Sequence, residues 1–157
     1  MNNRLLIAGV ISLLALSNCE RQNIKPQTEG EPNSSNDYFI FGHTAGFCLN
    51  CDAVYKIQDG KLYGANHQNI FYPDSVQFKS FPDTSYKLVS SLSSEIPPPL
   101  LKESSMNIGT YFPDAGHYYI EVSHNHEVHH WYIEAGNTPC YLANFLKDVS
   151  AAMGKLE

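Results

Sequence analysis

The clearest pattern of apolar and polar positions lies between His117 and Glu134, where residues alternate on both sides of Asn125-His126. Alternation with a period of two is typical of strands that bury one face. A turn centred on Asn125-His126 predicts a hairpin with one mostly apolar face. On that face three pairs lie opposite each other: Tyr118 with Ile133, Ile120 with Trp131, and Val122 with His129. Since both strands agree on the buried face, the register is well specified.

A second pattern begins after Thr138-Pro139. Apolar residues recur there at intervals of three and four, namely Leu142, Phe145, Leu146, Val149, Ala152, Met153 and Leu156. This spacing predicts an amphipathic helix of about 17 residues. Thr138 is expected to cap it and Pro139 to occupy its first turn.

Shorter patterns predict three strands near the start of the domain. Tyr38–Phe41 and Ala53–Ile57 are rich in aromatic and β-branched residues, as strands are. Asp59-Gly60 predicts a tight hairpin turn, after which Leu62–Gly64 begins a return strand. The two glycines of Gly42–Phe47 suggest a bend or bulge.

The middle of the chain is less regular. Val76–Phe78 suggests a short strand, and Pro82-Asp83 suggests the start of a short helix that buries Leu88, Val89 and Leu92. The prolines of Ile96–Leu101 end that helix and lead into another short turn. The predicted order is β-β-β-α-β-β-α. We therefore expect one α+β domain over residues 38–157, with an antiparallel sheet of about five strands and the C-terminal helix packed on one face.

The first residues indicate export. Met1–Asn18 has one arginine followed by an apolar run of signal-peptide length, too short for a membrane-spanning helix. Leu16-Ser17-Asn18-Cys19 resembles the lipobox of bacterial lipoproteins, with Asn18 where that family has Gly or Ala. The resemblance implies cleavage after residue 18 and acylation of Cys19. We expect a lipid-anchored protein of the bacterial envelope, in the outer membrane.

Residues 19–37 are polar, and we expect a disordered, lipidated tether there. After cleavage, the chain has nine Lys and Arg residues and 16 Asp and Glu residues, which gives a net charge of −7. Such an acidic chain does not suit nucleic acid, whose phosphates attract a basic surface. The expected partners are the membrane, through the lipid, and a protein.

The hairpin holds five of the seven histidines, so it is the candidate metal centre. One possible ligand set is His117, Glu121, His130 and Glu134, and another is His124 and His126 at the tip. The predicted register instead places Glu134 opposite His117 and Glu121 opposite His130. That favours a solvated ladder of polar pairs, and we expect neither a metal nor another cofactor.

Cys48 and Cys51 have the spacing of a disulfide, a zinc site or a redox pair. Because an exported protein meets an oxidising compartment, a structural Cys48–Cys51 disulfide is the favoured interpretation. Pairing of either cysteine with Cys140 and metal binding stay open. In the favoured interpretation Cys140 is the unpaired cysteine and is buried.

No serine-hydrolase elbow, zinc-protease motif, phosphate loop or dinucleotide fingerprint occurs, and we do not expect an enzyme. Several segments together resemble a family of small Bacteroidetes-type lipoproteins without an assigned activity: the lipobox, Gly42–Cys48, Gly116–Glu121 and Pro139–Leu142. Element order is more loosely similar to emfourin-type metallopeptidase inhibitors. That likeness rests on Gly42, Ala45-Gly46, Pro99-Leu100 and Tyr118–Ile120.

Three functions follow as hypotheses. The first is a non-catalytic module that binds a protein or peptide through an edge strand or an aromatic outer face. The second is inhibition of a secreted metallopeptidase, and the third is transition-metal binding by the hairpin.

Overall fold

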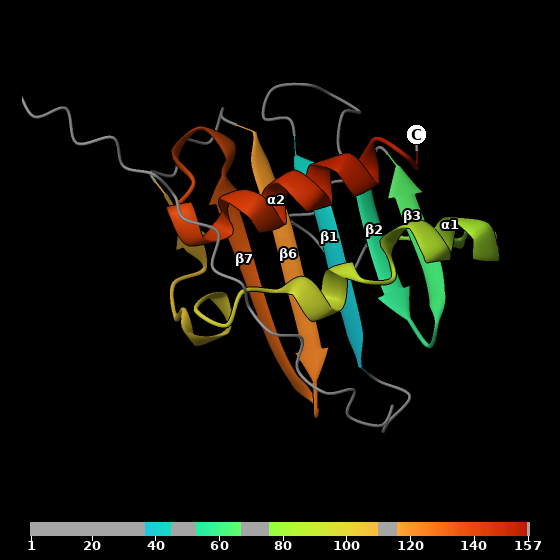
Figure 1. The fold of residues 1–157 in the computed structure, drawn as a ribbon. Coiled ribbons are helices and arrows are strands. Elements are labelled where there is room, and N and C mark those ends of the chain that lie inside the picture. Colours follow the sequence, from blue (N-terminus) through green and yellow to red (C-terminus); the bar gives the residue numbers. More distant parts are fainter. Residues whose placement is uncertain (1–36, 45–52, 67–75, 110–115, 157) are drawn as a thin grey trace, which may run out of the picture.

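The computed structural model describes residues 37–44, 53–66, 76–109 and 116–156, which form a curved sheet with helices on one side (Figure 1). The sheet has seven strands in the order β4-β3-β2-β1-β6-β7-β5. Its five long strands are β1 (Tyr38–Thr44), β2 (Ala53–Gln58), β3 (Lys61–Asn66), β6 (His117–His124) and β7 (Glu127–Glu134). All neighbours pair antiparallel except β5 (Asn107–Ile108), which runs parallel to β7.

The α+β class and the mostly antiparallel sheet are confirmed, but the sheet has seven strands and not five. The two additional strands, β4 (Lys79–Ser80) and β5, are two residues long each, at opposite edges. Two residues are too few to show a period, so the sequence pattern does not reveal them. The strand expected at Val76–Phe78 is wrong, because pairing with β3 begins only at Lys79.

The bend or bulge expected in Gly42–Phe47 does not occur in its described part, since β1 continues through Gly42 to Thr44, and residues 45–47 lie outside the described residues. Gly42 is needed for a different reason. A Cβ atom there would lie 2.5 Å from the carbonyl oxygen of Ala53 on β2. Glycine thus allows the close approach of the two strands.

Both predicted tight turns are confirmed. Asp59 and Gly60 have φ angles of 51° and 69°, and Asn125 and His126 have 52° and 68°. Two successive positive φ angles define the turn whose twist matches antiparallel strands. The β6–β7 register is the one expected, with Ile120 opposite Trp131 and the neighbouring pairs following in step.

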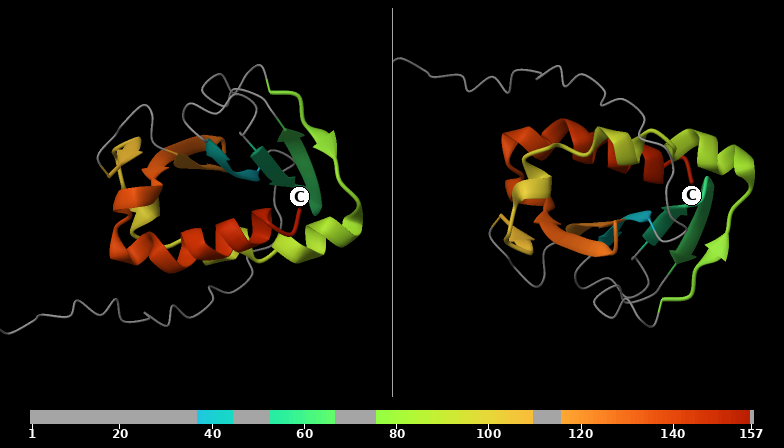
Figure 2. Two further views of the ribbon diagram at one scale, coloured as in Figure 1. Left: turned by 90° about the horizontal axis from the view of Figure 1, so that it is seen from above. Right: turned by 90° about the horizontal axis from the view of Figure 1, so that it is seen from below.

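The helices lie on one face of the sheet, as Figure 2 shows from above and below. The main one is α2 (Cys140–Met153), and the expected C-terminal helix is confirmed, although it has 14 residues. In the described part of the chain before it lie α1 (Asp83–Val89) and the short 3-10 helices η2 (Leu92–Glu95), η3 (Leu100–Lys102) and η4 (Ala135–Asn137). Thr138 does not cap α2, because its hydroxyl donates to the Glu134 carbonyl oxygen at 2.9 Å.

The core lies between this face of the sheet and the helices. Its largest fully buried side chains include Trp131, Tyr55, Phe41, Leu62, Leu100, Ile120, Ile133 and Leu142. Of the α1 residues expected in the core, Val89 is buried but Leu88 is 48% exposed. Leu88, Val89 and Leu92 do not form one apolar stripe, because α1 ends at Val89 and Leu92 belongs to the separate helix η2.

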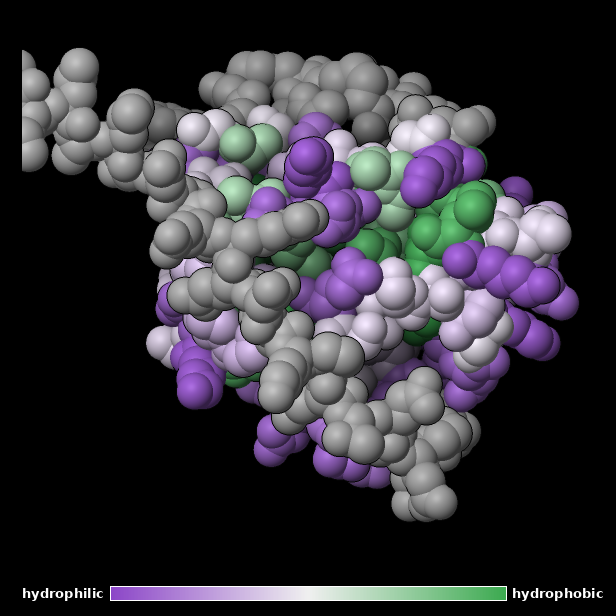
Figure 3. Space-filling model, viewed as in Figure 1, coloured by the Kyte–Doolittle hydropathy of each residue, from purple (hydrophilic) through white to green (hydrophobic). Residues whose placement is uncertain are grey.

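Seen from the helix side, the described surface is largely hydrophilic, with hydrophobic side chains showing between the polar ones (Figure 3). None of the described helices combines the length and apolar character needed to cross a membrane.

Candidate functional site

The second face of the sheet is the candidate site, because no described helix packs on it (Figure 2). Alternate residues of β1, β2, β6 and β7 point to this open face. Ile40, Val54 and Tyr119 form a small buried cluster there, with Tyr38, Phe78 and Tyr132 packed against it. This cluster is separate from the main core on the other side of the sheet.

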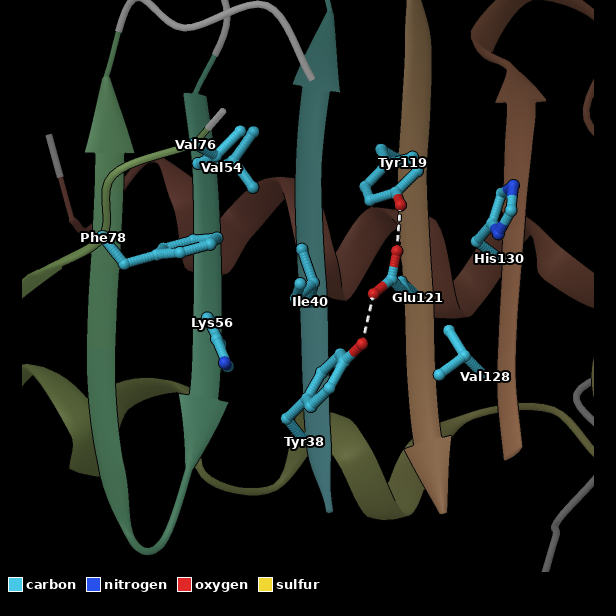
Figure 4. A pocket seen from close by; sticks show the side chains of 10 residues that line it. All are labelled: Tyr38, Ile40, Val54, Lys56, Val76, Phe78, Tyr119, Glu121, Val128 and His130. Atoms are coloured by element: carbon cyan, nitrogen blue, oxygen red, sulfur yellow. Dashed lines mark hydrogen bonds between the residues drawn. The ribbon is translucent and has the colours of Figure 1, made fainter. Parts of the chain in front are cut away.

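The open face is hollowed into a pocket of about 370 Å³ (Figure 4). Its lining comes from four strands and the segment before β4: Tyr38, Ile40, Val54, Lys56, Val76, Phe78, Tyr119, Glu121, Val128 and His130. Most of these side chains are apolar or aromatic, with a few charged groups among them. That composition is typical of ligand-binding pockets.

Glu121 is the central polar group of this pocket. Tyr38 donates its hydroxyl to Glu121 Oε1 at 2.7 Å, and the Tyr119 hydroxyl donates to Oε2 (Figure 4). Only 6% of Glu121 is exposed. The expected solvated ladder is therefore wrong at this pair: the carboxylate opposite His130 is buried, and two phenols from β1 and β6 hold it.

The pKa values of Tyr38 and Tyr119 are strongly raised. Burial raises the pKa of both phenols well above the ordinary value of 10.0, and the adjacent negative charge of Glu121 raises each pKa further. Both hydroxyls thus remain protonated donors throughout the physiological range. The carboxylate has two fixed donors, one on each oxygen.

Lys56 supplies a positive charge at the other side of the pocket. Its Nζ atom lies 4.6 Å from the centroid of the Tyr38 ring and 5.8 Å from that of Phe78. These are cation–π distances. Lys56 thus stands over two aromatic rings and makes no ion pair with Glu121.

The β7 side of the pocket lies at an open sheet edge. Strand β5 pairs with Tyr132 and Ile133 only, so within the described residues no strand covers β7 from Glu127 to Trp131. The Tyr132 N–H points outward and donates to the Met106 carbonyl at 2.7 Å. By the alternation of antiparallel ladders, the main-chain groups of Val128 and His130 point outward as well.

The structure does not bring the candidate metal ligands into a shared site. Among the described residues, no group of three or more His, Cys, Asp or Glu side chains is placed to hold a metal ion. At the tip, His126 is exposed and His124 Nδ1 lies 2.9 Å from Asp37 Oδ2. Asp37 also accepts the Asn125 N–H at 3.0 Å, so this last residue of the expected tether contacts the hairpin.

His117 and Glu134, the other proposed pair, are 2% and 8% exposed, so here too the solvated ladder is wrong. They form a row with Thr44, which lies opposite His117 on β1. This order of hydroxyl, imidazole and carboxylate occurs in nucleophilic enzymes. Thr44 Oγ1 makes no hydrogen bond to a described residue, so no described general base contacts this hydroxyl.

Cys48 and Cys51 lie outside the described residues, as does Cys19, so the Cys48–Cys51 disulfide stays a prediction. Cys140 corrects one expectation. It is exposed and disulfide-bonded, and not the buried, unpaired cysteine. The sequence has four cysteines, so the partner of Cys140, the first residue of α2, is Cys19, Cys48 or Cys51. If Cys19 is acylated, a Cys48–Cys51 disulfide would leave Cys140 without a partner, and the pairing of Cys140 with Cys48 or Cys51 that the sequence left open then takes its place.

Comparisons with known proteins add no assignment. No protein-family model matches the chain, and no curated protein sequence matches it either. The function is therefore inferred from the open face and its pocket.

Sequence reasoning singled out Glu121 and His130 in this pocket but missed most of the lining. The sequence pattern does not single out Lys56, Phe78, Ile40 or Val54, because these residues lie far from the hairpin in the chain. The face of each strand follows from its alternation. That β1 lies beside β6 does not, and this pairing brings Tyr38 to Glu121.

Proposed function

We propose that this protein is a non-catalytic binding module that takes an extended peptide segment of a partner protein on the open face of its sheet. One observation carries the proposal: the described helices cover one face, while the other has a pocket of about 370 Å³ with aromatic walls. Aromatic side chains provide large contact areas at low entropic cost, and they are enriched at interfaces.

The edge of β7 favours an extended peptide as the occupant. Val128 and His130 line the pocket, and their outward main-chain groups lie along the stretch that no described strand covers. Peptides commonly add a strand to such an edge: main-chain hydrogen bonds give affinity, and pockets for alternate side chains give specificity. Both elements of that binding mode occur side by side here.

A matched pair of surface variants tests the proposal. Val128 at the pocket is 52% exposed, and Leu88 on α1 is 48% exposed. Random peptides displayed on phage are selected against the wild-type domain, and the enriched peptides are measured against Val128→Glu and Leu88→Glu. We expect Val128→Glu to abolish binding and Leu88→Glu to preserve it. Failure to enrich any peptide, or equal binding to both variants, would contradict the proposal.

Two assays separate this function from the other hypotheses. A thermolysin-like peptidase should keep its full activity in the presence of excess domain, whereas stoichiometric loss would indicate an inhibitor. Micromolar zinc should leave the melting temperature of the domain unchanged, whereas a rise would indicate a metal site.

The proposal places the module at the bacterial outer membrane, held by acylated Cys19. Contact of Asp37 with the β6–β7 turn means that the tether joins the domain at that end of the sheet. Labelled palmitate should be incorporated into the wild-type protein and not into Cys19→Ser, which should leave the membrane fraction. Equal labelling of both proteins would contradict acylation at Cys19.

A further inference from the structure

Among the described residues, the Glu121 carboxylate has no cationic partner. Although the residue is 6% exposed, no Lys, Arg or His nitrogen of the described chain forms an ion pair with it. Carboxylates are rarely buried to this degree unless they are paired, because removing a charge from water is costly. Two phenol donors offset part of that cost, but they carry no positive charge.

The carboxylate also faces a space that a ligand can enter. Glu121 is among the residues that line the pocket, and its carboxylate lies between the hydroxyls of Tyr38 and Tyr119 (Figure 4). The Tyr119 ring is grouped with His130 and Tyr132, at centroid distances of 6.2 Å and 5.2 Å. A buried carboxylate among aromatic rings suits a cation, which the charge and the ring faces both attract.

Lys56 does not fill this role. Its ammonium group lies over the Tyr38 and Phe78 rings, at the β2 side of the pocket. The pocket thus already holds one cation on its aromatic wall and leaves the carboxylate for another. A second cation near Glu121 experiences repulsion from Lys56, and this repulsion gives the test its second variant.

We propose that Glu121 is the recognition site for a basic side chain, lysine or arginine, of the bound peptide. This inference rests on the proposed function, since it names the residue type that the open face selects. The ammonium or guanidinium group contacts the carboxylate, while the phenols of Tyr38 and Tyr119 keep both oxygens oriented. The alkyl part of the side chain packs on Ile40 and the surrounding rings.

The test uses small probes in place of an unidentified peptide. n-Butylammonium and n-propylguanidinium reproduce the two basic side chains, and butyramide and butyrate serve as neutral and anionic controls. Each is titrated into the domain at pH 7 while amide NMR shifts are followed. We expect both cations to shift the amides around Glu121 and Tyr119 with saturation, and the controls to cause much smaller shifts.

Two variants then test the charge. Glu121→Gln keeps the shape but removes the negative charge, so cation affinity should fall about tenfold or more, as for other buried charge pairs. Lys56→Met removes the competing charge, and cation affinity should rise roughly twofold or more. If Glu121→Gln fails to fold, two other results decide whether the site binds a cation. These are the preference of the wild-type domain for cations over the control compounds and the rise in cation affinity in Lys56→Met.

The outcomes separate this inference from the proposed function. Equal shifts from cations and controls, tighter binding of butyrate, or weaker cation binding by Lys56→Met would overturn the basic-side-chain site. The phage-selected peptides would still test the open face, because the Val128→Glu comparison can be made for any selected peptide, whatever its charge. If the selected peptides have no excess of Lys or Arg but no longer bind Val128→Glu, the basic-side-chain site is wrong and the proposed function still holds.

Discussion

Tyr38 and Glu121 are 83 positions apart in the chain, yet the Tyr38 hydroxyl donates to Glu121 Oε1 at 2.7 Å. The bond joins the first residue of β1 to the middle of β6, and Tyr119 donates to the second carboxylate oxygen. A buried carboxylate that loses a donor keeps its desolvation cost without the compensating bond. This arrangement is therefore important for stability as well as for recognition.

Removing one donor should destabilise the domain. We expect Tyr38→Phe to lower the free energy of unfolding by about 1–3 kcal/mol, the usual cost of an unsatisfied buried group. In a Glu121→Leu background, which has no carboxylate, the same change should cost much less. Urea unfolding of the four proteins completes the cycle. If Tyr38→Phe lowers the free energy of unfolding equally in both backgrounds, the Tyr38–Glu121 hydrogen bond does not contribute to stability.

The raised pKa values of Tyr38 and Tyr119 predict a loss of stability in alkali. Below the ordinary pKa of 10.0 both phenols are protonated whether the chain is folded or not. Above it the unfolded phenols lose their protons while the folded ones keep them. The unfolded state then binds fewer protons, so stability falls as pH rises. Urea unfolding from about pH 9 to pH 11 should show a steeper fall for wild type than for the Tyr38→Phe, Tyr119→Phe double variant. Identical slopes would contradict the account.

Gly64 on β3 provides a test of the sheet edge beside the site. A Cβ atom there would lie 2.4 Å from Cε2 of Phe81, whose ring also packs edge-on against Tyr55. We expect Gly64→Ala to cost about 1–3 kcal/mol, because the ring must move. The cost should shrink in a Phe81→Ala background. Gly154→Ala is the control, since its nearest contact is 3.7 Å and it should be nearly neutral. Equal thermal shifts for Gly64→Ala and Gly154→Ala would be inconsistent with this packing.

Cys140 should resist alkylation until the protein is reduced, since it is disulfide-bonded. Mass spectrometry of the non-reduced, alkylated and digested protein reads out both its protection and the peptide bound to it. Cys140→Ser should lower the free energy of unfolding by about 2–5 kcal/mol, as is usual when a native disulfide is removed from a small domain. Labelling of Cys140 without reductant would show that the bond does not form in solution.

Local patterns predicted much of this fold. The β6–β7 register follows from alternation around Asn125-His126, and the buried stripe of α2 follows from its spacing of three and four. Both signals lie within a single hairpin or helix. The sequence pattern therefore shows which residues share a face, and the structure agrees.

The site was less predictable, because it depends on contacts between distant strands. Nothing in the local pattern indicates that β1 lies beside β6, so the donors to Glu121 and its burial were missed. The predicted pairing of His130 with Glu121 suggested a solvated polar pair, whereas the Glu121 carboxylate is buried and accepts hydrogen bonds from two phenols. Short strands such as β4 are likewise formed by main-chain pairing that leaves no trace in residue type.

The central claim is that the open face binds a peptide along β7. Amide hydrogen exchange of the wild-type domain, with and without a phage-selected peptide, tests it most directly. The account predicts that peptide binding slows exchange at Val128 and His130, whose N–H groups point outward, and at the pocket residues Tyr119 and Glu121. Protection confined to α1 and α2, with no change along β7, would contradict it.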